Sequence, residues 1–239
     1  MKLHGQRVVV LGGTSGIGLA TARAAAEEGA EVLVASSTAA GVDRALAALP
    51  AGAQGRVADL SRTERVRSLF EDLGEIHHLV YTAGEPLELT PLATLDPEQA
   101  KSFFTVRFFG ALAAVRAAAP HLRPGGSVTL TTGIAKDRPG PGWAVAAAVC
   151  GAMESLTRAL AVELAPIRVN AISPGVVRSP LWDRMDEADR ERMYRETAAA
   201  VPVGRVGETD EVAQAYLFAM TQPFATGTVI TVDGGAILV

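Results

Sequence analysis

Short apolar, β-branched runs alternate with longer segments of helical periodicity along the whole chain. The strands predicted from this pattern are 7–11, 31–35, 54–58, 77–81, 127–131, 167–171 and 228–232, and the helices are 16–28, 41–49, 62–73, 97–119, 142–164 and 208–220. The strands are apolar along most of their length, as is typical of parallel strands covered on both faces. This order predicts a single α/β domain over residues 1–239, a doubly wound parallel sheet of about seven strands with helices on both faces.

One segment, 178–207, lacks this regularity and contains Trp182, Tyr194 and many charged residues. A structureless stretch of this length is uncommon inside a compact domain. We therefore expect a mobile helical lid that covers a binding site.

Composition limits the classes of function that the chain can have. Apolar residues make up 49% of the 239 residues, charged residues 20%, and the net charge is −4. Acidic and basic residues are interspersed, which argues against a nucleic-acid-binding face. With one cysteine, Cys150, no intrachain disulfide can form, and neither a signal peptide nor a transmembrane span is evident. We expect a cytoplasmic protein with no membrane partner.

A glycine-rich turn follows the first predicted strand and precedes the first predicted helix, with the sequence Gly12-Gly13-Thr14-Ser15-Gly16-Ile17-Gly18. A chain that turns sharply and approaches a pyrophosphate closely requires residues without a Cβ. The helix that follows directs its free N–H groups at the phosphates. The turn in this context predicts a dinucleotide site, and the alternative is a glycine turn that serves packing alone.

The spacing G-x-x-x-G-x-G and several later motifs resemble those of the short-chain dehydrogenase/reductase family. The later motifs are Ala58-Asp59-Leu60, Thr82-Ala83-Gly84, Val162-Glu163-Leu164, Arg168-Val169-Asn170, Ser173-Pro174-Gly175, the pair Val177 and Ser179, and Val232-Asp233-Gly234-Gly235. The resemblance covers nearly the whole chain. It implies a Rossmann-type fold and an oxidoreductase that transfers hydride between a nicotinamide cofactor and a small carbonyl or alcohol substrate.

The resemblance also implies which residues hold the cofactor. These are Gly12, Thr14, Ser15, Gly16, Ile17, Gly18, Ser36, Ser37, Asp59, Leu60, Thr82, Ala83, Gly84, Pro174, Gly175, Val177 and Ser179. The second strand ends in Ala35-Ser36-Ser37-Thr38, with no acid to bind the ribose hydroxyls of NAD. A 2′-phosphate would meet no repulsion there, so we expect NADP(H) rather than NAD(H). The nearest cation to this corner is Arg44, and the sequence does not predict where its side chain points.

The family's four working residues are not all present. Alignment on the family motifs puts Ala146 at the position of the catalytic Tyr, Cys150 at that of the Lys, Thr132 at that of the Ser and Arg107 at that of the Asn. No tyrosine lies between Tyr81 and Tyr194, so no shift of register restores one. Alanine cannot transfer a proton, and the family's proton relay therefore does not apply to this chain.

Three interpretations remain open. In the first, hydride transfer continues and the proton comes from Lys136, Asp137, Tyr194 or a water held by Thr132. In the second, the fold binds a dinucleotide without turnover, as a sensor or partner subunit. In the third, the pocket performs non-redox chemistry with Cys150 as nucleophile, because a helix N-terminus and Arg107 would favour its thiolate; the alternative for Cys150 is an inert core residue.

Compared with the family, the pocket gains a cation at Arg107, where the family has an Asn. It loses a cation at Cys150, where the family has a Lys. We expect the guanidinium to fill part of the vacated space and to bind the nicotinamide ribose or an anionic substrate group; the alternative is that it turns outward. The four histidines, His4, His77, His78 and His121, are predicted to lie at the surface, away from the site. They lack metal-ligand spacing, so we expect no metal.

Helix 97–119 carries four of the seven phenylalanines of the chain, Phe103, Phe104, Phe108 and Phe109. Adjacent residues diverge by about 100° around a helix, so one helix cannot direct all four onto its own sheet. The resemblance implies pairing of this helix and the next across a two-fold axis. We expect a homodimer or homotetramer built on 97–119 and 142–164.

Overall fold

The computed structural model describes residues 1–87 and 89–239 of the chain. Seven parallel strands form one sheet in the order β3-β2-β1-β4-β5-β6-β9. Their bounds are β1 Arg7–Leu11, β2 Glu31–Ser36, β3 Gln54–Val57, β4 Ile76–Tyr81, β5 Leu122–Thr131, β6 Arg168–Pro174 and β9 Val229–Val232. The predicted doubly wound sheet is confirmed, with strand β5 beginning earlier than its sequence pattern indicated.

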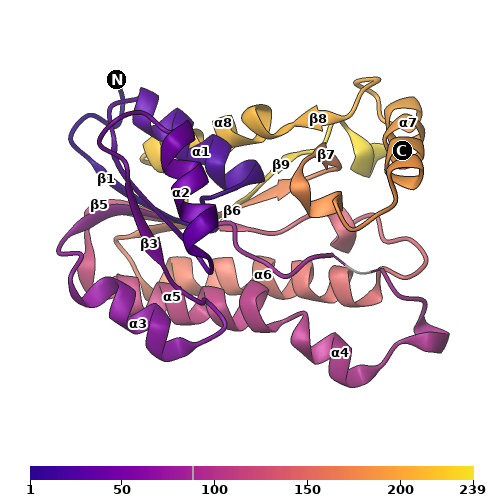
Figure 1. Ribbon diagram of the computed structural model, residues 1–239, viewed down its shortest axis with the longest axis horizontal. Helices are drawn as coiled ribbons and strands as arrows, with labels where there is room; N and C mark the ends of the chain where they lie inside the picture. Colours follow the sequence, from indigo (N-terminus) through magenta and orange to yellow (C-terminus); the bar gives the residue numbers. More distant parts are fainter. Residues whose placement is uncertain (88) are drawn as a thin grey trace.

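Helices cover both faces of the sheet (Figure 1). They are α1 Gly16–Glu27, α2 Ala39–Ala48, α3 Thr63–Glu71, α4 Pro97–Ser102, α5 Ala111–Ala118, α6 Ala144–Glu163, α7 Glu187–Ala200 and α8 Thr209–Thr221. Helices α1, α2 and α8 pack on one face, and α3, α5 and α6 pack on the other. Short 3-10 turns occur at Leu92–Thr94, Ala119–His121, Ile134–Lys136, Pro180–Trp182 and Ala236–Leu238.

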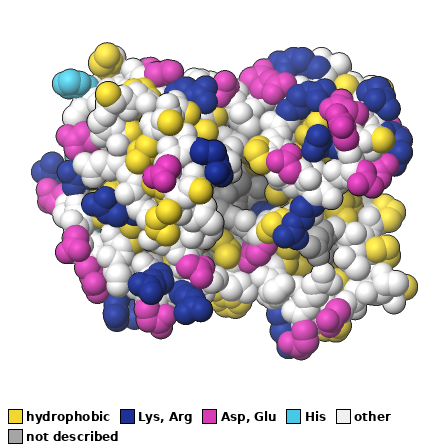
Figure 2. Space-filling view, viewed as in Figure 1, with side chains coloured by type: hydrophobic (Ala, Val, Ile, Leu, Met, Phe, Trp, Pro, Cys, Tyr) yellow, Lys and Arg dark blue, Asp and Glu magenta, His cyan; other side chains and the backbone are white. Residues whose placement is uncertain are grey.

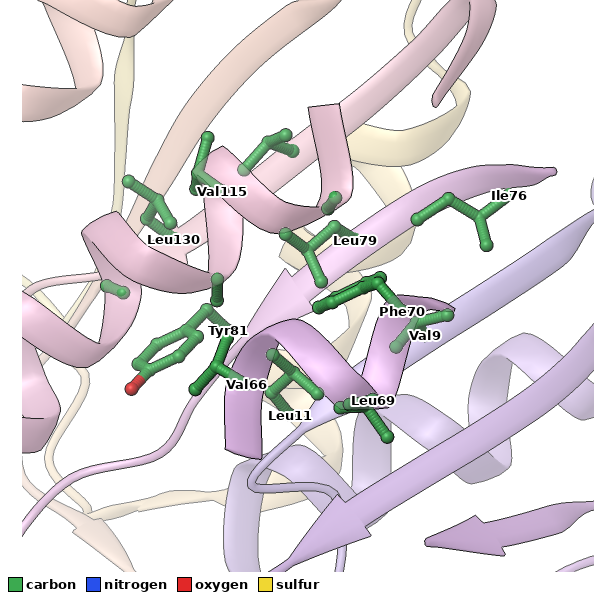
Figure 3. Close-up of a cluster of buried hydrophobic side chains, with 14 of the residues drawn as sticks. Val9, Leu11, Val66, Leu69, Phe70, Ile76, Leu79, Tyr81, Val115 and Leu130 are labelled. Carbon is green, nitrogen blue, oxygen red and sulfur yellow. The ribbon is translucent and has the colours of Figure 1, made fainter. Parts of the chain in front are cut away.

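The core between the sheet and helices α3 and α5 contains alternate residues of β1 and β4 together with apolar residues of the helices (Figure 3). Val9 and Leu79 are fully buried there, and Phe70 of α3 is 1% exposed. Tyr81 lies at the end of β4, and its hydroxyl leaves the cluster to donate to the carbonyl oxygen of Val106 at 2.6 Å. This bond ties the core to the chain segment that borders the carboxyl end of the sheet.

The predicted helix 97–119 is interrupted by a π-helical turn, Thr105–Gly110. Within it the amide N–H of Phe109 donates to the carbonyl of Phe104, five residues back, at 3.0 Å. Phe103 is 8% exposed, whereas Phe109 is 59% exposed. The four phenylalanines do not share one buried face, and this confirms the prediction from helical geometry. Single π turns of this kind are frequent at functional sites.

The segment 178–207 is largely helical. Its two ends are held together by a two-stranded parallel pair, β7 Val177–Arg178 and β8 Gly207–Glu208. Trp182 and Tyr194 pack with Val206 in a small cluster of their own, and the indole N–H of Trp182 donates to the carbonyl of Val177 at 3.0 Å. The segment thus covers the carboxyl end of β6 as a separate folded layer.

The prediction that all four histidines lie at the surface is wrong for His78, which is 3% exposed. Its Nδ1 lies 2.8 Å from Oγ of Ser127, and its Nε2 lies 2.6 Å from Oε1 of Gln6. Both ring nitrogens therefore have polar partners, which explains how β4 accommodates an imidazole in its buried face. Burial lowers the pKa of His78 to about 3, and the nearby Arg168 acts in the same direction.

By length and composition alone, two helical stretches, Pro97–His121 and Ala144–Glu163, could cross a membrane. Both belong to the α/β domain, in which α5 and α6 pack against the sheet. Only 33% and 28% of their most apolar windows are buried, so each leaves apolar surface uncovered in the single chain.

Candidate active site

A cavity of about 1040 Å³ opens at the carboxyl ends of the strands. It lies where Figure 2 shows a hollow between the surface over α1 and α2 and the surface over α7. Open parallel α/β sheets bind their ligands at this edge. All the residues predicted to hold the cofactor line it, together with Arg107 and Thr132. The cofactor residues are Gly12, Thr14, Ser15, Gly16, Ile17, Gly18, Ser36, Ser37, Asp59, Leu60, Thr82, Ala83, Gly84, Pro174, Gly175, Val177 and Ser179.

The glycine turn forms one end of the cavity, and its glycines have different surroundings. A Cβ on Gly18 would lie 2.3 Å from the carbonyl oxygen of Gly12, so helix α1 can pack on the end of β1 only if residue 18 has no side chain. A Cβ on Gly16, where φ is +51°, would instead point across the opening towards Pro180, 3.4 Å away. The N-terminus of α1 is therefore open to the cavity through Gly16.

Hydroxyl groups gather at the end of β2. A Cβ on Gly41, in the first turn of α2, would have the Oγ atoms of Thr38, Thr14 and Ser36 at 2.9, 3.6 and 3.7 Å. Thr38 caps α2 by accepting the N–H of Gly41 at 3.2 Å, and Ser37 lines the cavity beside it. These hydroxyls and the start of a helix form a neutral, donor-rich corner suited to an anion.

Asp59 lies at the end of β3, on the same side of the cavity. Its Oδ1 accepts the backbone N–H of Ser61 at 3.0 Å and the hydroxyl of Ser61 at 2.6 Å. These hydrogen bonds lower the pKa of Asp59, and the charge of Arg62 adds to the effect. Asp59 is therefore an ionised acceptor held in a fixed orientation.

The other end of the cavity is formed by α6, the β5–α6 connection and the segment 178–207. Helix α6 contributes Ala146, Val149 and Cys150 and carries neither tyrosine nor lysine. The hydroxyl of Thr132 donates to the carbonyl of Cys150 at 2.9 Å. Since its hydrogen is engaged there, the oxygen of Thr132 can accept a hydrogen bond from a ligand or water.

Arg107 projects from the π turn into this end of the cavity rather than outward. Its Cζ lies 4.7 Å from the ring centroid of Phe103, and its Nη2 donates to the carbonyl of Glu85. A Cβ on Gly84 would lie 2.7 Å from Cζ, so the guanidinium rests directly on the backbone of the Thr82-Ala83-Gly84 motif. Its Nε is buried and has no hydrogen-bond partner among the described residues.

Glu85 partly balances the charge of Arg107. Its Oε1 accepts the N–H of Val106 at 2.5 Å, its Oε2 accepts the N–H of Arg107 at 3.3 Å, and Nε of Arg107 lies 3.7 Å from Oε2. The carboxylate therefore binds the amides of the π turn as well as the side chain. Burial lowers the pKa of Arg107, whereas the negative charge of Glu85 raises it. A guanidinium nevertheless stays charged in proteins.

Three of the four candidate proton donors named from the sequence lie outside the lining of the cavity. Lys136 is paired with Asp137 at 2.7 Å and with Glu154 at 2.6 Å. Neither it, Asp137 nor Tyr194 is among the described residues that line the cavity, and Tyr194 is 4% exposed beneath Arg178. Thr132 is the one of the four that faces the cavity.

The surroundings of Cys150 favour the alternative of an inert core residue over that of a nucleophile. Burial raises the pKa of the Cys150 thiol, against the smaller opposing effects of Thr132, Arg107 and Lys136. Cys150 lies inside α6, beyond its first turn, so the N–H groups of the helix end do not stabilise a thiolate. The thiol is therefore a poor nucleophile.

Sequence reasoning missed Glu85, Phe103 and Trp143, which all line the cavity. Glu85 directly follows the Thr82-Ala83-Gly84 motif, and this adjacency was the available signal. Trp143 precedes α6 as its N-cap residue. Within the described residues, no group of three or more His, Cys, Asp or Glu is placed to hold a metal ion.

Residues 12–236 match the family model described as enoyl-(acyl carrier protein) reductase. The short-chain dehydrogenase/reductase malC of Malbranchea aurantiaca is 32% identical over 99% of this chain and 96% of its own length. The chain belongs to the short-chain dehydrogenase/reductase family.

Solved structures of the family agree with this assignment. A small-chain dehydrogenase in complex with NADPH is 39% identical, with a TM-score of 0.86 over 98% of this chain and 99% of that one. The MalC reductase/Diels-Alderase of Malbranchea aurantiaca superimposes with a TM-score of 0.92 at 32% identity, over 100% of this chain and 98% of its own. The family fold is thus common to these proteins, and one of them binds NADPH.

Proposed function

We propose that the chain is an NADPH-dependent reductase in which Arg107 and a water on Thr132 replace the family's tyrosine and lysine. The proposal rests on one observation: the glycine turn and Arg107 border the same cavity. Bound there, NADPH would supply a hydride to the substrate.

The residues present fit this cofactor. The open N-terminus of α1 at Gly16 suits the pyrophosphate, and Asp59, Thr82 and the Pro174-Gly175 turn would hold the adenine and nicotinamide ends. Ser36, Ser37 and the start of α2 would hold a 2′-phosphate, which supports NADP(H) over NAD(H). The NADPH complex of a relative 39% identical to this chain also supports the choice.

Arg107 would stabilise the negative charge that develops on the substrate oxygen when hydride arrives. A fixed guanidinium in a water-poor pocket stabilises such a charge more strongly than water does. Because Arg107 remains charged, it binds the oxyanion and does not protonate it. The proton would come from a water that Thr132 holds through its free lone pair.

The segment 178–207 would act as a lid that moves as a unit about the β7–β8 pair, excluding water from the cavity. The apolar surface left on α5 and α6 would be covered by a second copy of the chain, giving a homodimer or homotetramer. We propose a cytoplasmic location and no nucleic-acid partner.

A second candidate is non-redox chemistry in the same pocket. The solved structure of MalC is described as a reductase and Diels-Alderase. A cycloaddition transfers no proton, so it needs a shaped cavity and a hydrogen-bond donor to activate a carbonyl, a role that Arg107 could fill without a tyrosine. The third candidate is dinucleotide binding without turnover, as a sensor or partner subunit.

The test measures transfer of deuterium from C4-deuterated NADPH to diketones, quinones and 3-oxoacyl thioesters. We expect the wild type to produce labelled alcohol and to reduce ordinary ketones slowly. Arg107→Gln should lower kcat about 10²-fold. Ala146→Tyr with Cys150→Lys should be outperformed by the same pair with Arg107→Asn, because the guanidinium repels a second cation. Cofactor binding without label transfer, to any of these acceptors, would contradict the reductase.

A further inference from the structure

A second cavity, of about 380 Å³, lies at the amino ends of the strands, on the edge of the sheet opposite the dinucleotide cavity. Its walls come from Lys2 and Gln6 before β1, from His78 on β4, from Arg168 on β6 and from the end of α8. The two cavities share no lining residue. The second cavity is therefore available to a ligand that takes no part in the proposed reaction.

Three buried polar side chains form a row across the sheet at this edge. His78 of β4 is paired with Ser127 of β5, and Ser127 is paired with Arg168 of β6. Residues paired directly across neighbouring strands project from the same face of a sheet, so the imidazole, the hydroxyl and the guanidinium are neighbours. Their residues are 3%, 0% and 8% exposed. The row places polar groups where a core would otherwise be apolar.

The hydrogen bonds of His78 leave one donor of Gln6 free. Burial and Arg168 lower the pKa of His78 to about 3, so its ring is neutral at pH 7. Oε1 of Gln6 can only accept, so Nε2 of the ring donates to it at 2.6 Å, and Nδ1 accepts the hydroxyl of Ser127 at 2.8 Å. The amide NH₂ of Gln6 has no acceptor among the described residues, and Gln6 lines the cavity.

The charge of Arg168 is only partly balanced by the protein. Its Nη1 and Nη2 donate to the carbonyls of Ala219 and Met220 at 2.6 and 2.7 Å. These carbonyls belong to the last turn of α8, whose dipole supplies only about half a negative charge. Burial lowers the pKa of Arg168 with no acid opposing it, and no Asp or Glu is among the described residues that line the cavity. A buried cation without a full counter-charge is costly, so the cavity favours an anion.

A second cation, Lys2, lies at the exposed rim of the cavity. Glu28 accepts the backbone N–H of Lys2 at 2.7 Å and pairs with the amino group of Met1 at 3.8 Å, so its charge is already engaged. The cavity thus has two positive groups and one amide donor, and the imidazole is neutral. A tetrahedral dianion matches this set, because its two charges balance both cations and its four oxygens accept from several directions.

We propose that this second cavity binds a phosphate-type oxyanion, held by Arg168 at its base, the amide of Gln6 at its wall and Lys2 at its rim. Inorganic phosphate and the phosphate group of a small metabolite supply the same chemistry. The proposal goes beyond the proposed function and does not depend on it.

The test follows the ring signal of His78 by NMR in histidine-labelled protein as sodium phosphate is added at neutral pH. His121, which packs near Phe70 on the other face of the sheet, is the internal reference. We expect the His78 signal to shift with saturation, with a Kd of about 1 mM, and the His121 signal to stay in place. Sulfate should act as phosphate does, whereas acetate at equal ionic strength should not.

A shift that does not saturate, or an equal shift with acetate, would reflect a general salt effect and would overturn the proposal. Glycerol phosphate separates the two sources of the anion. Tighter binding of this ester than of inorganic phosphate supports the proposal with a phosphorylated metabolite as the ligand, and equal or weaker binding supports it with the free anion.

Two variants, each with a matched control, test the named contacts. Gln6→Glu keeps the acceptor for His78 but adds a negative charge to the wall, so it should abolish the saturable shift. Gln214→Glu, exposed on α8, should leave the shift unchanged. Lys2→Gln should weaken phosphate about tenfold, and Lys101→Gln, exposed on α4, should not.

Wild-type affinity for phosphate in both Gln6→Glu and Lys2→Gln would overturn the proposal. Arg168 is left unchanged in these variants because its loss would also remove the hydrogen bonds that it donates to the end of α8. If a variant does not fold, the comparison of phosphate with acetate in the wild type still decides the proposal.

Discussion

The guanidinium of Arg107 rests on the backbone of Gly84, where an added Cβ would lie 2.7 Å from both Cζ and Nη1. The two residues are therefore coupled: residue 84 can hold no side chain while Arg107 keeps its position. We predict that Gly84→Ala displaces Arg107 and reduces kcat of the proposed reductase about as much as Arg107→Gln does. The double variant should be no slower than either single variant, because both remove the same contact.

The measurement is a double-mutant cycle on kcat with thermal denaturation of each variant as a folding control. The contact involves the far end of a flexible side chain, so the fold should persist in Gly84→Ala. Fully additive losses would show that Gly84 and Arg107 act separately.

A second prediction separates the two glycines of the turn. Gly16→Val places a branched side chain across the cavity opening and should abolish NADPH binding; a β-branched residue at a φ of +51° is also strained and should lower the melting temperature to some extent. Gly18→Ala places its Cβ 2.3 Å from the carbonyl oxygen of Gly12 and should mainly lower the melting temperature. Thermal denaturation of both variants is followed by calorimetry with NADPH at a temperature where both are folded. Retained NADPH binding in Gly16→Val, or loss of binding without loss of stability in Gly18→Ala, would contradict the assigned roles.

The third prediction concerns acid stability. Burial lowers the pKa of His78 to about 3, whereas an unfolded histidine titrates near about 6.5. Between these pH values the unfolded chain binds a proton at His78 and the folded chain does not, so protonation favours unfolding. The folded state therefore has its full stability above about pH 6.5 and loses stability as pH falls towards about 3. At pH 5 the loss should be about 2 kcal/mol relative to pH 7.

Urea denaturation of wild type and His78→Gln at pH 7 and pH 5 measures this effect. The variant lacks the titrating ring and should lose less stability between the two pH values. His4→Gln, at an exposed position, is the control and should behave as wild type. An equal pH dependence in His78→Gln and wild type would contradict the prediction.

The fourth prediction concerns assembly. Phe109 is 59% exposed on the helical segment proposed to pair with a second copy, while Val57 is 56% exposed on the edge strand β3. Phe109→Asp should shift the mass measured by light scattering towards the monomer, and Val57→Asp should not. A monomeric wild type at micromolar concentration would refute the proposed dimer or tetramer.

Periodicity predicted the strands and most helices because each is a local pattern of buried positions. The π turn at Thr105–Gly110 was not predictable in this way, because residues distant in sequence hold it. The carbonyl of Val106 accepts from the hydroxyl of Tyr81, and the N–H of Val106 donates to Glu85. The same bonds direct Arg107 into the cavity, a direction that a helical wheel does not determine.

Burial of His78 also depended on partners from other elements. A polar ring at the start of a strand is typical of the surface, and only the placement of Gln6 and Ser127 beside it makes burial tolerable. The cofactor end of the site was predicted well because its motifs follow strand ends directly. The substrate end depended on side chains from Phe103 and Trp143, which no motif singled out.

The most direct test of the account is a calorimetric titration of the wild-type protein with NADPH and, separately, with NADH. The account predicts one NADPH bound per chain, with NADH about tenfold weaker or more, because the hydroxyls of Ser36 and Ser37 and the start of α2 would bind the 2′-phosphate. No heat with either dinucleotide, or tighter binding of NADH, would contradict it.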